Sequence, residues 1–229
     1  MVQLILALSL LLSVVTGFQA VEFSPAHVER GAEQSISVPV RPEPVGAEIP
    51  DGIFGQLGPV LSESERYVYD LAISVLNILE NEDWGALGAM VHPTEGLTFS
   101  PYAHIDTKNA VKLGAGDVKA LGIDEQVRVW GSFDGSGHPI EMTFTEYYGQ
   151  FILTHDFVRA LHIGVNRLVV KGNSPSNLQV LGNGVVFVEY HVPGSEGEGA
   201  FDWASLRLVF SGYEGELYLV GIVHDQWTI

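Results

Sequence analysis

The sequence predicts an α+β fold in which N-terminal helices pack on a mainly antiparallel sheet. Helical patterns gather in the first part of the region expected to fold, and a run of long strand patterns ends it. This segregated order favours an antiparallel sheet over alternating βαβ units. With 46% hydrophobic residues among its 229, the chain can bury a substantial core.

Residues 1–20 predict a signal peptide. The apolar run from Leu4 to Val15 is shorter than the roughly 20 residues of a membrane helix and suits a signal-peptide core. An uncleaved N-terminal anchor is the alternative, because no Lys or Arg precedes the run. We therefore expect a secreted or extracytoplasmic protein, membrane-anchored only if the segment is not cleaved. The sequence has no cysteine, so the expected domain is stabilised by its core without disulfides.

Residues 21–59 predict a disordered tether, because they contain six prolines and lack a sustained helical or alternating pattern. A single α+β domain is expected over residues 60–229. Its first helix is expected at 63–80, because Ser62 and Glu65 have capping-box spacing. Apolar residues then recur at helical spacing, among them Tyr67, Leu71, Val75 and Ile78.

A second, short helix is expected after Asp83, in "WGALGAMV", and ends before His92-Pro93 because a residue preceding proline avoids helical geometry. Thr143 and Glu146 repeat the capping-box spacing and predict a helix at 144–152. "GAGD" at 114–117 is interpreted as a helix start, because a phosphate cradle needs a longer loop and a lysine.

Strands are expected where β-branched and aromatic residues cluster between turn signals. The expected strands are 97–100, 110–113, 126–133, the "HPIEMTF" segment after a turn at 134–137, 184–191, and a closing hairpin of "SLRLVF" and "ELYLVGIVHDQW" around "SGYEG". The stretch "GNSPSN" at 172–177 is expected to be a loop.

The formal charge is -17, from 28 acidic and 11 basic side chains. Nucleic acid is not expected as a partner, because phosphate backbones reward clusters of Lys and Arg, and the sequence has none. An anionic membrane surface is disfavoured for the same reason.

Three stretches, "ENEDWGALGAMVHPTEGLTFSPYAHIDTKN", "WGSFDGSGHPIEMTFTEYY" and "SLRLVF...YLVGIVHDQWTI", resemble an uncharacterised family of extracytoplasmic, often lipoprotein-like proteins of Bacillus-type and related bacteria. The resemblance covers roughly residues 62–229 and implies no established activity. The element order is also similar to the curved-sheet cone of nuclear transport factor two-like and cystatin-like domains. That second resemblance implies a fold only, because such cones serve as enzymes, binding modules and oligomerisation domains.

The closing strand carries the most informative polar residues. Strict alternation over 217–229 puts His224 and Asp225 on opposite faces, so the two are not expected to form an acid–base dyad. Asp225 shares its face with Val223 and Trp227, and a buried carboxylate needs a partner. Arg207 and Arg128 are the expected partners, and backbone amides at the sheet rim are the alternative. If the face lines a pocket, burial would raise the pKa of Asp225 and make it a base or a polar anchor.

These observations lead to a non-catalytic ligand-binding or interaction module as the first functional hypothesis. Its expected ligand-binding residues are Asp225, Trp227, Trp130 and Tyr190, although core packing explains the aromatic residues at least as well. A small apolar ligand or a cell-envelope protein is the expected partner, and a homodimer through the open sheet face is a further possibility.

The alternative hypothesis is a small-molecule isomerase, cyclase or hydrolase. It would use Asp225 with His92 or His104 in an apolar cavity, so the three side chains would have to line one pocket. No cofactor and no metal are expected, because the eight histidines show no metal-ligand spacing such as H-E-x-x-H.

Overall fold

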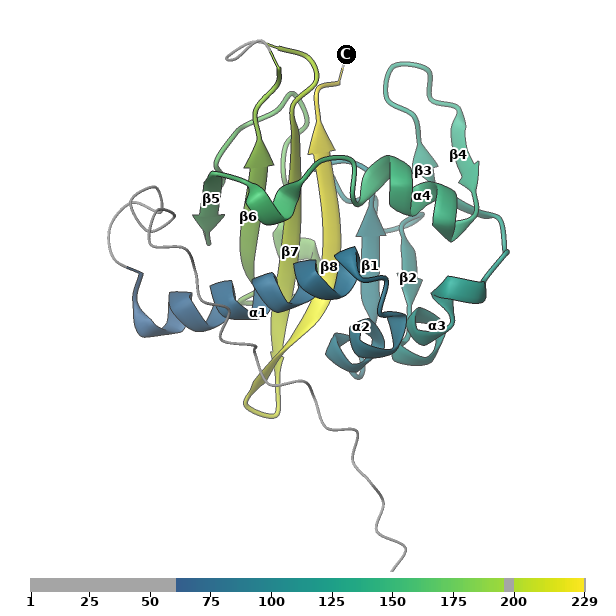
Figure 1. The fold of residues 1–229 in the computed structure, drawn as a ribbon. Coiled ribbons are helices and arrows are strands. Elements are labelled where there is room, and N and C mark those ends of the chain that lie inside the picture. Colours follow the sequence, from purple (N-terminus) through teal and green to yellow (C-terminus); the bar gives the residue numbers. More distant parts are fainter. Residues whose placement is uncertain (1–60, 196–199, 229) are drawn as a thin grey trace, which may run out of the picture. The chain divides into compact units, whose positions relative to one another are not determined.

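The computed structural model describes residues 61–195 and 200–228. The predicted signal peptide at 1–20 and tether at 21–59 lie outside the described residues. Within the described part of the chain, no helix is both long and apolar enough to cross a membrane. The fold combines a few helices with a curved, mainly antiparallel sheet (Figure 1).

The described helices are α1 (Glu63–Glu80), α2 (Trp84–Met90), α3 (Ala115–Lys119) and α4 (Phe144–Phe151), with short 3₁₀ helices η1 (Leu121–Ile123), η2 (Phe157–Arg159) and η3 (Leu178–Leu181). The described strands are β1 (Leu97–Ser100), β2 (Val111–Leu113), β3 (Arg128–Ser132), β4 (Pro139–Met142), β5 (His162–Val165), β6 (Val186–Val192), β7 (Ala204–Tyr213) and β8 (Glu216–Gln226). Strand β5 has no counterpart among the expected strands.

Helix α1 begins where its capping box predicts. The Ser62 hydroxyl accepts a hydrogen bond from the Glu65 N–H at 3.3 Å, and the Glu65 carboxylate accepts one from the Ser62 N–H at 2.9 Å. Thr143 and Glu146 form the same reciprocal pair at the start of α4. Both predicted capping boxes are confirmed. Helix α1 then crosses the sheet in front of β6, β7 and β8 (Figure 1) and buries its apolar stripe there.

Replacing Ser62 by alanine is expected to lower the free energy of unfolding by about 1 kcal/mol, because it removes one half of the capping box. Urea denaturation of the wild type and of Ser62→Ala measures the loss. Ser132→Ala, at an exposed position in β3, is the control and should stay within about 0.5 kcal/mol of the wild type. An unchanged urea midpoint in Ser62→Ala would contradict the role of the cap.

The main sheet has six strands in the order β2-β1-β8-β7-β6-β5, and β3 pairs separately with β4. Every neighbouring pair is antiparallel except β1 and β8, which run parallel. The predicted closing hairpin is confirmed as β7 and β8. Its turn is tighter than expected, because Glu214 and Gly215 both have left-handed backbone angles (φ 51° and 90°), which suits a two-residue hairpin loop.

The predicted strict alternation along 217–229 is wrong in one place. Val209 pairs with Gly221 and Phe210 pairs with Leu219, so Val220 is an extra residue in a β-bulge. As a result, Leu219 packs in the same core as Ile222, whereas Val220 packs on the other face with Val223.

The sheet is therefore covered on both faces. The larger core lies on the α1 face and includes Leu206 and Phe210 of β7. The smaller core on the opposite face joins Ile105, Leu178, Val209, Val220 and Val223. The segment between β5 and β6 lies over this second face, and the candidate site is there.

Candidate functional site

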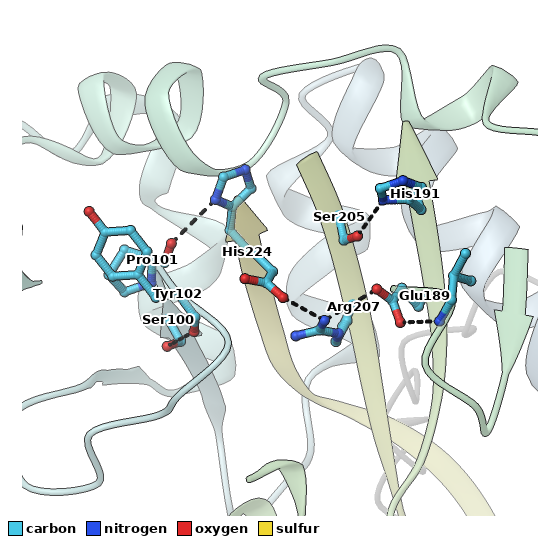
Figure 2. A network of polar contacts seen from close by, with 10 residues as sticks. Ser100, Pro101, Tyr102, Glu189, His191, Ser205, Arg207 and His224 are labelled. Carbon is cyan, nitrogen blue, oxygen red and sulfur yellow. Dashed lines mark hydrogen bonds and ion pairs between the residues drawn. The ribbon is translucent and has the colours of Figure 1, made fainter. Parts of the chain in front are cut away.

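Arg207 is the centre of a buried charge network on the face opposite α1. It pairs directly across from Glu189 of β6 and from Val223 of β8, and Asp225 lies two residues further along β8. Side chains two residues apart on a strand share a face, so the three charged side chains meet. The Arg207 Nη2 donates to Asp225 Oδ2 at 2.7 Å and to Glu189 Oε1 at 3.2 Å (Figure 2). All three side chains are at most 1% exposed.

The network holds two carboxylates against one guanidinium. Burial raises the pKa of the Asp225 carboxyl, the attraction of Arg207 partly opposes that rise, and the Glu189 charge adds to it. Glu189 has a further donor, because its Oε2 accepts a hydrogen bond from the Val169 N–H at 2.9 Å. Asp225 is therefore the carboxylate that the network satisfies less completely.

Three polar atoms of the network lack hydrogen-bond partners among the described residues. They are Nε and Nη1 of Arg207 and Oδ1 of Asp225. Buried polar atoms are nearly always paired in folded proteins, with protein groups or with bound water. Donors and an acceptor left open at one place therefore indicate a position where water or a ligand binds.

A pocket of about 350 Å³ lies at this position. Its floor is Arg207 and Asp225, and its wall is the segment 168–177, called the strap from here on. The lining residues of the strap are Leu168, Val170, Lys171, Gly172, Asn173, Ser174, Pro175 and Ser176. The pocket thus combines a charged, buried floor with a wall of hydroxyl, amide and ammonium groups.

The strap is fixed near both ends and in the middle by hydrogen bonds to other segments of the chain. Val169 donates to Glu189, and the Asn173 side chain donates to the Thr228 carbonyl at 2.5 Å. The Asn177 side chain bonds both the N–H and the carbonyl of Ile105, at 2.8 and 3.1 Å. These bonds explain how the "GNSPSN" loop, confirmed as irregular structure, can hold a defined wall.

Gly172 brings the strap close to the floor. A Cβ at this position would lie 2.9 Å from Cη2 of Trp203 and 3.2 and 3.3 Å from the two carboxylate oxygens of Asp225. Only a residue without a side chain fits there without displacement. The backbone of Gly172 therefore lies close to the Asp225 carboxylate, and both residues line the pocket.

The expected pairing of Asp225 with Arg207 is confirmed. Arg128, the other expected partner, instead forms an ion pair with Asp124 at 2.6 Å. Sequence reasoning missed Glu189 and the strap. Glu189 and His191 are two residues apart in the strand segment "VEYH", so they lie on the same face of the sheet. Placing Glu189 beside Arg207 would also have required the register of β6 with β7.

The catalytic candidates His92 and His104 do not join Asp225. His92 is buried beside Tyr213 and Tyr218, and its Nδ1 accepts the N–H groups of Thr94 and Glu95. Its backbone bonds Leu219, six residues before Asp225 and therefore on the order of 20 Å away along the strand. His104 is exposed. Neither histidine lines the pocket.

The expected ligand-binding aromatic residues also lie apart from it. Trp130 is buried and stacks on Tyr147 with ring centres 4.1 Å apart, and Tyr190 is buried in the core that packs against α1. Trp227 is 38% exposed and contacts Phe201, which is 70% exposed. Of the four expected ligand-binding residues, only Asp225 lines the pocket.

His224 lies on the α1 face, away from Asp225, as the alternation predicts. Its Nδ1–H donates to the Pro101 carbonyl at 3.2 Å (Figure 2), and its Nε2 lies 3.3 Å from the Thr154 hydroxyl. Burial lowers the pKa of His224 to about 4, so the ring is neutral at pH 7. The neutral ring accounts for both contacts, and His224 acts as a structural residue.

Within residues 61–195 and 200–228, no group of three or more His, Asp or Glu side chains could hold a metal ion. Comparisons of the chain with protein-family models, curated proteins and solved structures gave no significant match.

Proposed function

We propose that the chain is an extracytoplasmic, non-catalytic binding module that holds a small polar ligand in the pocket between the strap and Arg207. The observation that carries the proposal is the set of open atoms on the floor, Arg207 Nε and Nη1 and Asp225 Oδ1. The network holds these atoms in position, so a ligand that reaches them meets donors and an acceptor that are already oriented.

Two sequence features support the extracytoplasmic part of the proposal. They are the apolar run from Leu4 to Val15 and the resemblance to extracytoplasmic proteins. The position of α1 across a curved sheet that ends in the hairpin of β7 and β8 supports a cone similar to nuclear transport factor two-like domains. A binding role is preferred to an enzymatic one, because the neighbour of Asp225 is Arg207 and neither His92 nor His104 lines the pocket.

Gly172→Ala provides the test, because the new methyl group would lie over the Asp225 carboxylate. A chemically mixed panel of small polar molecules is screened by ligand-observed NMR. We expect at least one binder, with affinity at least tenfold weaker for Gly172→Ala than for the wild type.

Gly149→Ala is the matched control, since a Cβ on Gly149 of α4 meets nothing within 4 Å. It should bind like the wild type. Equal affinity of every binder for Gly172→Ala and the wild type would show that the pocket is not the binding site.

A further inference from the structure

The charge of the floor restricts the ligand. Arg207 is already matched by Asp225 and Glu189, so the buried network carries a formal charge of -1 when both carboxylates are ionised. Lys171 on the strap offsets this charge, so the network and the strap together are formally neutral. An anion would lie beside Asp225, and a cation beside Arg207, so either charge would meet repulsion in a poorly solvated site. A neutral ligand avoids both.

The open atoms set the hydrogen-bonding pattern. Arg207 can only donate, and the open Oδ1 of an ionised Asp225 can only accept. A ligand that satisfies the floor must therefore accept a hydrogen bond and donate one at neighbouring positions. A hydroxyl group can do both, and two adjacent hydroxyls can form hydrogen bonds with Arg207 and Asp225 at the same time.

The strap also offers groups that can form hydrogen bonds with hydroxyls of a ligand. Ser174 and Ser176 line the pocket, and neither side chain makes a hydrogen bond to another residue in the described part of the chain. Leu168, Val170 and Pro175 contribute apolar surface that can contact C–H groups. The volume of about 350 Å³ is at the small end of the range for small-molecule sites, which fits one ring.

We infer that the ligand is a neutral polyol of monosaccharide size, whose adjacent hydroxyls bond Arg207 and Asp225 on the floor and the serines of the strap. This inference rests on the proposed function, because it names the ligand class of the same pocket. The polyol replaces the water that would otherwise satisfy the open atoms.

The experiment titrates the wild-type protein with four sets of probes, using NMR and tryptophan fluorescence. The sets are neutral sugars and polyols (glucose, galactose, mannose, ribose and inositol), carboxylates and phosphate, primary amides, and alkylamines. We expect at least one polyol to bind, and its deoxy analogue, which lacks one hydroxyl of the adjacent pair, to bind at least tenfold more weakly. We expect the Ser174→Ala/Ser176→Ala double variant to weaken polyol binding at least fivefold, while Ser132→Ala leaves it unchanged.

The outcomes separate the two proposals. If amides, anions or amines bind and polyols do not, and Gly172→Ala weakens that binding, the polyol inference is overturned and the proposed function stands. If no probe of any set binds the wild type, the open atoms hold water only, and both proposals are overturned. Equal binding of a polyol and its deoxy analogue would also overturn the inference, because the adjacent hydroxyls would then have no role.

Discussion

Replacing Arg207 by methionine is expected to lower the free energy of unfolding by about 3–5 kcal/mol. The substitution keeps most of the buried volume but leaves Glu189 and Asp225 facing each other without a cation. Both carboxylates are at most 1% exposed, so bulk water cannot replace the guanidinium as their counter-charge. Urea denaturation at pH 7 measures the loss.

Arg159→Met is the matched control, because Arg159 forms an ion pair with Asp156 at 2.8 Å but is 85% exposed. Exposed pairs contribute little, so this variant should stay within about 1 kcal/mol of the wild type. Similar losses in the two variants would contradict a special role for the buried network.

Neutralising Asp225 in the Arg207→Met variant should restore part of the stability. In Arg207→Met/Asp225→Asn, one of the two uncompensated charges is gone, so the loss should be smaller than the sum of the two single losses. Fully additive losses would show that Arg207 and Asp225 do not stabilise each other. The double variant therefore separates the ion pair from the packing of the two side chains.

The local elements of the fold could be predicted because their signals lie within a few residues. The reciprocal bonds of Ser62 with Glu65 fix the start of α1, and the Asp83 side chain, which accepts from the Ala86 N–H at 2.9 Å, fixes the start of α2. The bulge at Val220 could not be predicted in this way. It depends on the pairing of β7 with β8, which is a contact between strands and leaves no signal in the pattern of one strand.

The candidate site, like the fold, combines features that the sequence predicts with features that depend on tertiary contacts. The burial of Asp225 and its pairing with Arg207 could be predicted, because a carboxylate interrupts an apolar strand face and a neighbouring strand carries a cation. The addition of Glu189 depends on the register of β6 with β7, and the position of the strap depends on side-chain bonds between distant segments, such as Asn177 with Ile105. The pocket therefore depends on tertiary structure and could not be predicted from the spacing of residues in the sequence.

The stability of the protein is expected to fall by about 3 kcal/mol from His224 alone as the pH is lowered from 6.5 to 4. Burial lowers the pKa of the folded-state ring from 6.5 to about 4, and each pKa unit corresponds to about 1.4 kcal/mol. Between these values the unfolded chain binds the proton and the folded chain does not, so protonation favours unfolding. The contribution is complete above pH 6.5 and lost towards pH 4.

Other groups titrate in or near the same range and must be separated from His224. The raised pKa of Asp225 acts in the opposite direction, because the folded state then binds its proton first and gains stability as the pH falls. Carboxyls with lowered pKa values, such as those of Asp124 and Asp202, lose stability near and below pH 4. A variant that changes only His224 retains all of these contributions, so the difference between two pH curves isolates the histidine.

His224→Gln is the appropriate variant, because glutamine does not titrate and its amide can still donate to the Pro101 carbonyl. Free energies of unfolding at several pH values between 7 and 4 should fall less steeply in this variant, with a difference of about 3 kcal/mol accumulated over the range. His138→Gln, at an exposed position, reports any effect of the substitution itself. Parallel curves for the wild type and His224→Gln would mean that His224 binds its proton in the folded state, which contradicts the lowered pKa that burial gives the ring.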